Sequence, residues 1–92
     1  MENYSEKIRI IARNIVKTRK NKHLTQQELA DKIGWTRAQI LKYEKGEVKR
    51  MSYLFLLDVA KALDVTIEDL ENENLGNEEL KDKEMEDRNV EE

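Results

Sequence analysis

The chain of 92 residues contains no cysteine, which excludes a disulfide framework and a metal site built from thiolates. It also lacks an apolar run long enough for a signal peptide or a membrane span, so we expect a cytoplasmic protein that binds no membrane. Histidine occurs once, at His23, and without a second ligand or a nucleophilic partner it is expected in a loop or cap. We therefore expect no metal, no cofactor and no catalytic site.

The remaining composition fits one small domain whose charge is unevenly divided. Hydrophobic residues make up 38% of the chain, which supports a single compact core. The net charge is −3, but residues 1–70 hold 14 basic and 10 acidic side chains, whereas residues 71–92 hold 3 and 10. Basic segments favour polyanions through counterion release, and an acidic tail is repelled by them. The overall acidity is therefore no argument against DNA binding.

The stretch LTQQELADKIGWTRAQILKYEKG, residues 24–46, predicts two short helices joined by a tight turn. Thr25 is followed three residues later by Glu28, and Thr36 by Gln39, which is the capping-box pattern of a helix start. Gly34, between the two helices, can take the left-handed conformation that such a turn requires. Two capped helices around a glycine turn make a helix-turn-helix candidate.

Three further helices are predicted around this pair. The first has Ser5 as its cap, the fourth has Ser52, and the fifth has Thr66 with Asp69 as its capping partner. Asp64 is expected to take a left-handed conformation between the fourth and fifth helices. The predicted apolar stripes are Tyr4, Ile8, Ile11 and Ile15 in the first helix, Leu54, Leu57, Ala60 and Leu63 with Leu56 and Val59 beside them in the fourth, and Val65, Ile67 and Leu70 in the fifth.

The third predicted helix has two contrasting faces. Ile40 and Tyr43 share the face expected to pack inward. On an isolated helix, the cationic face opposite them would simply be solvated, but the second helix of a helix-turn-helix enters the major groove of DNA. The residues of this outward face are Arg37, Ala38, Leu41, Lys42 and Lys45.

Taken together, the motifs LTQQELADKIG, TRAQI, YEKG and VAKALDVTIEDL resemble the phage repressor and Cro type of DNA-binding domain, known as the XRE family. The resemblance covers residues 11–70. It implies an all-α, lambda-repressor-like fold of five helices, in which the second and third form the helix-turn-helix at residues 25–45. It also implies an ion pair between Arg19, at the end of the first helix, and Glu44, at the end of the third.

The same resemblance assigns DNA contacts residue by residue. Gln26, at the start of the second helix, would bind a phosphate with help from the helix dipole, and Thr36 would touch the backbone while capping its helix. Arg37 and Lys42 would suit the acceptors of guanine, and the Ala38 methyl would suit a thymine methyl. The complete predicted DNA-binding set, in which the last three residues hold phosphates, is Gln26, Thr36, Arg37, Ala38, Leu41, Lys42, Lys45, Lys49 and Arg50.

Three residues depart from the family pattern. Trp35 stands where a smaller aliphatic residue is usual, and it could fill the core or stand against the DNA backbone. Leu41 replaces a small polar residue, which favours contact with a thymine methyl or marks a protein surface. Met51 replaces a proline that often precedes the fourth helix, so the loop there is less constrained.

The acidic end of the chain predicts a tail rather than a second domain. Its few large apolar residues are spaced by five, so they form no helical stripe, and its composition is typical of a solvated, disordered segment. We therefore expect a helix-turn-helix domain of residues 1–71 and a disordered tail of residues 72–92. The tail could be a plain extension, a competitor of DNA for the basic surface, or a segment that folds on a partner.

These observations predict a sequence-specific, double-stranded DNA-binding transcriptional regulator that is not an enzyme. We expect a repressor acting as a homodimer on a palindromic operator, because one such domain presents few base contacts and two matched to half-sites multiply affinity and specificity.

Two alternatives remain open. The chain could be the antitoxin of a toxin–antitoxin pair, which binds a partner protein and autoregulates; Ile10 and Val16, which lie off the main stripe of the first helix, would supply that surface together with the tail. These two residues could otherwise serve satellite packing or a dimer contact. The chain could also be an interaction module that does not bind DNA.

Overall fold

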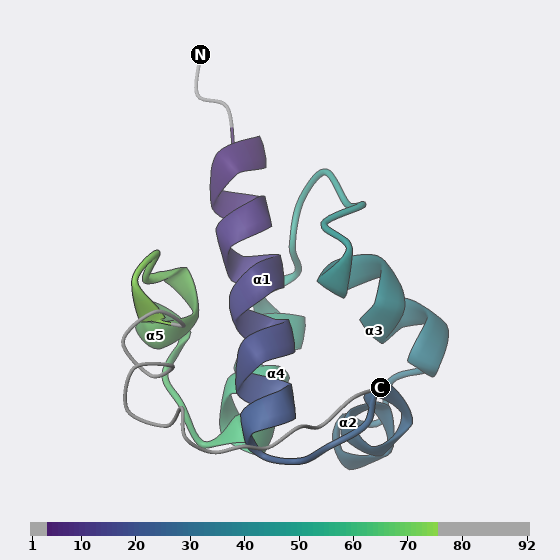
Figure 1. Cartoon of the computed structure of the whole chain (residues 1–92). Coiled ribbons are helices and arrows are strands. Elements are labelled where there is room, and N and C mark those ends of the chain that lie inside the picture. Colours follow the sequence, from purple (N-terminus) through teal and green to yellow (C-terminus); the bar gives the residue numbers. More distant parts are fainter. Residues whose placement is uncertain (1–3, 76–92) are drawn as a thin grey trace.

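The computed structural model describes residues 4–75, and within that range it contains five α-helices and no strand. The all-α, five-helix prediction is therefore confirmed for the described part. None of the helices formed by residues 4–75 has the length and apolarity needed to cross a membrane. The helices are α1 (Ser5–Asn21), α2 (Gln26–Ile33), α3 (Arg37–Glu44), α4 (Tyr53–Leu63) and α5 (Ile67–Glu71) (Figure 1).

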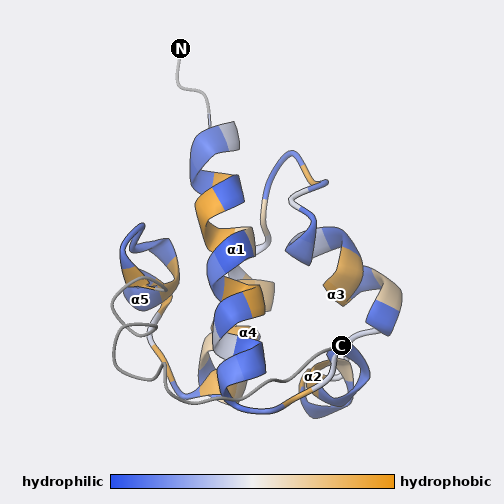
Figure 2. Ribbon diagram, in the orientation of Figure 1, coloured by the Kyte–Doolittle hydropathy of each residue, from blue (hydrophilic) through white to orange (hydrophobic). Residues whose placement is uncertain are grey.

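The long helix α1 is the axis around which the other helices are arranged. It contacts α3, α4 and α5, while α2 contacts α3 and α4. In Figure 1, α5 lies on one side of α1 and α3 on the other, with α2 next to α3. Hydrophobic and hydrophilic bands alternate along α1 in Figure 2, as expected of a helix that buries one face. The helix-turn-helix therefore packs against the central helix α1 through α3.

Side-chain caps begin four of the five helices. Capping boxes are present at Thr25, Thr36 and Thr66, and the Ser52 hydroxyl accepts a bond from the N–H of Phe55, all as predicted. A cap of this kind contributes about 1 kcal/mol. Four helix starts are therefore determined by residues no more than three positions apart.

The predicted cap of α1 is wrong. Ser5 is the first helical residue, and Tyr4 occupies the cap position without a capping hydrogen bond from its side chain. The N–H of Ile8 already bonds to the carbonyl oxygen of Tyr4 at 2.9 Å, so the helical hydrogen bonds begin one residue earlier than a Ser5 cap would allow. Tyr4 consequently precedes the buried stripe and is 58% exposed, contrary to the prediction.

Left-handed residues make the predicted turns. Gly34 has φ +74° between α2 and α3, and Asp64 has φ +59° between α4 and α5. A Cβ atom at Gly34 would meet nothing within 4 Å, so glycine is favoured there by its backbone angle and not by space. His23, with φ +59°, lies in the loop between α1 and α2, as expected.

One apolar core joins all five helices. The apolar stripe predicted for α4 is wrong at its first residue. Leu54 is 65% exposed, whereas Leu63 is fully buried. Steps of three fall short of a helical turn, so nine residues rotate the side chain to about the opposite side of a helix. The buried face follows steps of four through Phe55, Val59 and Leu63 instead. The core consists of Ile11, Ile15, Leu29, Ala30, Ile40, Phe55, Leu56, Val59, Ala60, Leu63 and Leu70.

The chain after α5 is bonded to α1. The side-chain amide of Asn14, which is fully buried, donates to the carbonyl oxygens of Leu70 and Asn72, both at 2.8 Å. Arg13 Nη2 donates to the carbonyl oxygen of Glu73 at 2.7 Å. The predicted boundary after residue 71 and the predicted disorder of the tail stay predictions; most of that tail, residues 76–92, lies outside the described part.

Candidate nucleic-acid interface

Helix α3 packs by one face and presents the other to solvent. Ile40 is fully buried, and the ring of Tyr43 stacks on Phe55 with centroids 3.7 Å apart and planes at 26°. On the outward side, Arg37, Ala38 and Lys42 are exposed, and Leu41 is half-buried. The arrangement offers a row of cationic and small apolar side chains on a helix whose back is fixed.

The indole of Trp35 fixes the start of α3 against α4. Its ring meets Phe55 edge-on with centroids 5.0 Å apart and Tyr43 with centroids 6.4 Å apart, while its Nε1–H donates to Asp58 Oδ2 at 3.2 Å. Of the two predicted roles, filling the core is the one found, since Trp35 packs against the buried cluster. Aromatic pairs of this geometry contribute about 0.5–1.5 kcal/mol each beyond area burial.

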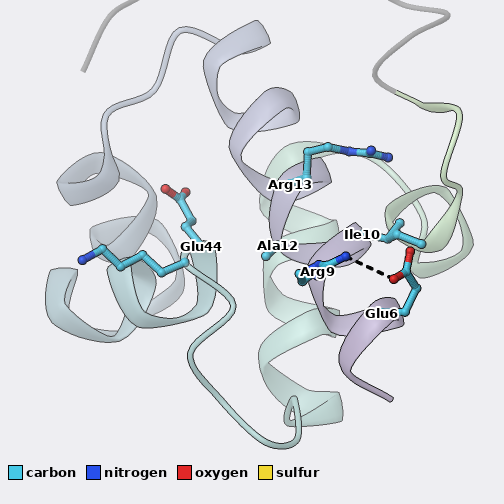
Figure 3. Close-up of a pocket in the computed structure, with 7 residues that line it drawn as sticks. Glu6, Arg9, Ile10, Ala12, Arg13 and Glu44 are labelled. Atoms are coloured by element: carbon cyan, nitrogen blue, oxygen red, sulfur yellow. Dashed lines mark hydrogen bonds and ion pairs between the residues drawn. The ribbon is translucent and has the colours of Figure 1, made fainter. Parts of the chain in front are cut away.

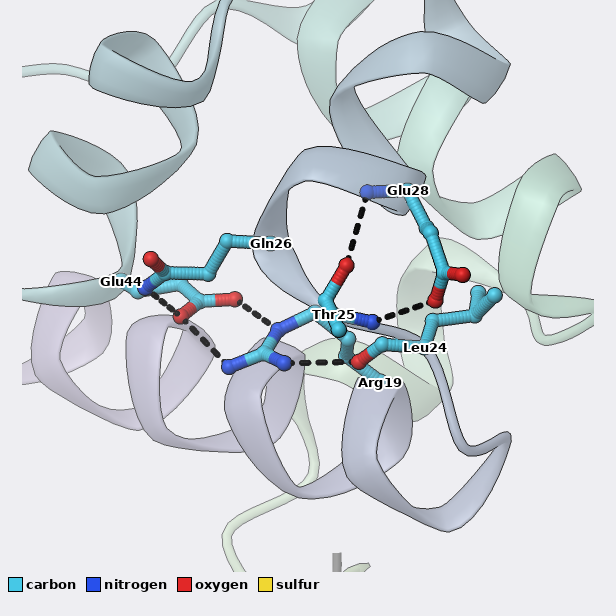
Figure 4. Close-up of polar contacts among 6 residues, drawn as sticks. All are labelled: Arg19, Leu24, Thr25, Gln26, Glu28 and Glu44. Carbon is cyan, nitrogen blue, oxygen red and sulfur yellow. Dashed lines mark hydrogen bonds and ion pairs between the residues drawn. The ribbon is translucent and has the colours of Figure 1, made fainter. Parts of the chain in front are cut away.

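The end of α3 is fixed by a buried ion pair. Arg19 Nε donates to Glu44 Oε2 at 2.6 Å and Nη2 donates to Oε1 at 3.1 Å, with the side chains 2% and 4% exposed (Figure 4). Arg19 Nη1 also donates to the Leu24 carbonyl oxygen at 2.8 Å. The pairing that the family resemblance implied is confirmed. Removing one partner would leave a buried charge unpaired, at a cost of about 3–5 kcal/mol.

Gln26 joins this cluster from the start of α2. Its Nε2 donates to Glu44 Oε1 at 3.0 Å, so a residue predicted to bind phosphate also bonds to the buried carboxylate (Figure 4). An amide nitrogen carries two N–H donors, and one bond to Glu44 leaves the second for a phosphate oxygen. The ends of α1 and α3 and the start of α2 therefore share one polar cluster.

The loop after α3 is held at both ends. Gly46 has φ +69°, and a Cβ atom there would lie 3.8 Å from the Cβ of Ala12, so the turn rests closely on α1. At the other end, Met51 packs against the core and the Ser52 N–H donates to the Tyr43 hydroxyl at 3.3 Å. Between these points, the side chains of Lys49 and Arg50 are exposed.

None of the nine predicted DNA-binding residues is buried. Gln26 and Leu41 are half-buried and the other seven are exposed. They come from the start of α2, from α3 and from the following loop, and α2 and α3 are in direct contact. Their role in DNA binding stays a prediction.

Gln39, for which the sequence predicts only a capping role, is exposed on the first turn of α3. Its Oε1 accepts bonds from the N–H and the hydroxyl of Thr36 at 2.9 and 3.1 Å. The cap bonds use its Oε1 and leave its amide nitrogen as a donor for a base acceptor, so the two-bond contact of glutamine with adenine would require the cap to open. Its position one residue after Ala38, on the helix predicted to enter the groove, was the signal available in the sequence. Among the described residues, no group of three or more His, Asp or Glu side chains is placed to hold a metal ion.

Comparison with known proteins agrees with this arrangement. The helix-turn-helix family profile matches residues 15–70, more than half of the chain, from the middle of α1 to α5. Over 61 residues the chain is 39% identical to a Bacillus subtilis (strain 168) protein named Uncharacterized HTH-type transcriptional regulator YqaE. That match covers 66% of this chain and 52% of the relative, so the chain spans about half of the relative's length. The chain therefore belongs to the XRE-type helix-turn-helix family of DNA-binding regulators.

Proposed function

We propose that the protein is a sequence-specific transcriptional regulator that reads double-stranded DNA by inserting α3 into the major groove. The observation that carries the proposal is the division of α3 into a fixed back, with Ile40 fully buried, and an exposed front bearing Arg37, Ala38 and Lys42. Family membership supports the same conclusion. The proposal assigns no catalytic role to the chain and places its action in the cytoplasm.

Each exposed side chain on α3 has a chemical role in this proposal. Arg37 and Lys42 donate to guanine O6 and N7, Ala38 contacts a thymine methyl, and the amide N–H of Gln39 is available to a base acceptor. Leu41, which is half-buried, adds an apolar contact at the edge. Phosphates are held by the side chains that flank the helix, which fix its register without reading sequence: Gln26, Thr36, Lys45, Lys49 and Arg50.

We further propose that the protein acts as a repressor and binds a roughly palindromic operator as a homodimer. A single recognition helix supplies limited discrimination, since each good base contact contributes only about 1–3 kcal/mol. Two copies on half-sites about 34 Å apart, one turn of DNA, double the number of base contacts. The resemblance to phage repressors supports the negative sign of regulation.

Selection of bound duplexes from a random pool, followed by affinity measurement on the selected site, tests the proposal. The variant Arg37→Ala/Lys42→Ala should lose about 2–6 kcal/mol of binding to that site, from two base contacts. The matched control is Lys7→Ala/Lys61→Ala, which also removes two exposed cations, but from α1 and α4. Equal affinities for the two variants would show that α3 does not read DNA. The selected sequences give the half-site symmetry, and sedimentation of the complex gives the number of copies bound.

A further inference from the structure

The outward side of α1 is strongly basic, and the proposed DNA contacts do not use it. The helix contains a single acidic residue, Glu6, against six lysines and arginines. Four of these cations recur at steps of four, four and three, so they share one side of the helix. We call this surface the basic face of α1 and define it as Arg9, Arg13, Lys17 and Lys20, the first two exposed and the last two half-buried.

A hollow of about 340 Å³ lies between this face and the end of α3 (Figure 3). Ile10 and Ala12 give it an apolar part, and Arg9, Arg13 and Lys45 give it positive charge. The two carboxylates in its lining are already paired, Glu6 with Arg9 and Glu44 with Arg19.

Two cations of the hollow have no such partner. Within residues 4–75, neither Arg13 nor Lys45 forms an ion pair. The hollow therefore suits a ligand that brings carboxylates together with an apolar side chain.

The acidic end of the chain begins next to this hollow. Arg13, which lines the hollow, also donates to the carbonyl oxygen of Glu73, and the neighbouring Asn14 donates to that of Asn72. Both bonds fasten the backbone just before residues 76–92. Those residues carry eight carboxylates against three cations, a net of −5, with Leu80, Met85 and Val90 as large apolar side chains.

We propose that residues 76–92 dock in the same molecule on the basic face of α1, over the hollow beside Lys45. The 17 residues of the segment can span up to about 56 Å, and α1 is only about 26 Å long. A short tether gives an effective concentration of about 1 mM, so even a contact with a dissociation constant of about 1 mM is half-occupied. Opposite charge and a backbone fixed to α1 at the start of the segment are therefore enough to populate the docked state without a large interface.

Docking has a consequence for DNA binding, and this part rests on the proposed function. Lys45 belongs both to the hollow and to the proposed phosphate contacts. The docked segment would cover it and bring negative charge to the edge of the interface. With an intramolecular contact of about 1 mM to 0.1 mM, DNA affinity would fall about twofold to tenfold.

Because the chain contains no cysteine, Met85→Cys gives a single site for a nitroxide spin label in the full chain. Paramagnetic broadening of amide signals should then be strong at Ile10, Arg13 and Lys45 and weak at Lys61 of α4. In 1 M salt, where the Debye length is about 3 Å, the broadening should largely disappear.

Charge variants in the labelled full chain supply the control. Arg13→Gln/Lys45→Gln should reduce the broadening at Ile10. The control Lys7→Gln/Lys61→Gln removes the same amount of charge elsewhere on the surface and should leave the broadening at Ile10 unchanged. Dispersed amide spectra would show that both variants are folded. Equal broadening in the two variants, or weak uniform broadening in the parent, would overturn the proposal.

A mixed sample separates docking within one molecule from docking between two. Broadening of an isotope-labelled, spin-free chain by a spin-labelled, isotope-free chain would mean that the segment binds a second copy, which overturns the intramolecular proposal. None of these measurements contains DNA, so their outcome is independent of the proposed function.

The effect on DNA is measured separately. Glu84→Gln/Glu86→Gln/Asp87→Asn should bind a random duplex about twofold to tenfold more tightly than the parent. If the parent chain shows docking but the variant binds DNA no more tightly than the parent, the docked segment does not compete with DNA.

Discussion

Replacement of Glu44 by leucine should destabilise the protein severely. The Glu44 carboxylate accepts three bonds, two from Arg19 and one from Gln26, and is 4% exposed in the fold. In Glu44→Leu the guanidinium of Arg19 stays buried and keeps its bond to the carbonyl oxygen of Leu24, but it loses its carboxylate partner. An unpaired buried charge costs about 3–5 kcal/mol, out of a total unfolding free energy of about 5–15 kcal/mol for a small domain.

Replacing both partners should restore most of this loss. In Arg19→Met/Glu44→Leu, neither charge of the pair remains buried, and apolar pairs of similar volume are often as stable as the ion pair that they replace. The sum of the two single-variant losses should therefore exceed the loss in the double variant by at least about 2 kcal/mol. The difference is a direct measure of the coupling between the ends of α1 and α3.

Urea unfolding followed by the fluorescence of Trp35, the one tryptophan of the chain, measures these free energies. Its ring lies against Phe55, so the signal reports loss of the packing between the start of α3 and α4. The matched control is Glu47→Leu, the same substitution at an exposed loop residue, which should stay within about 0.5 kcal/mol of the parent. A loss below about 1 kcal/mol in Glu44→Leu would refute the reasoning, because it would mean that the Arg19 guanidinium is hydrated in the folded variant.

Three smaller predictions test other parts of the fold and the interface. In urea unfolding, Leu63→Ala should cost about 2–5 kcal/mol and Leu54→Ala less than about 0.5 kcal/mol, and similar losses would contradict the exposure of Leu54. Gly34→Ala should cost about 1–2 kcal/mol in the same assay through its positive φ alone; an unchanged stability would mean that the turn rearranges without strain. Lys49→Ala and Arg50→Ala should each lower the slope of log affinity against log salt by about 0.9 at every duplex sequence, and a change in preferred sequence instead would assign the residue to base reading.

Much of the helix-turn-helix followed from the sequence because its signals are local. Thr36 finds its capping partner three residues away, and Gly34 takes its left-handed angle where a Cβ atom would have no neighbour within 4 Å. Such features depend on bonds within one turn of chain, so the residue types suffice to predict them. The pair between Arg19 and Glu44 was reached through family resemblance, since 25 residues separate the partners.

Tertiary structure decided the features that depend on which elements meet. Leu54 is as hydrophobic as Leu63, and only the packing of α4 against the other helices leaves one exposed and the other buried. The bond from Gln26 to Glu44 likewise needs α2 and α3 at their observed angle.

The sequence by itself determined where four of the five helices begin, where the chain turns, which family it belongs to and how its charge is divided. The structure decided which cations lie together. Arg13 and Lys45 are 32 positions apart in the chain and line one hollow, and Arg13 also holds the backbone that leads to the acidic segment. Capping and turn preferences act over a few residues, whereas a surface is formed by elements that only the packed core brings together.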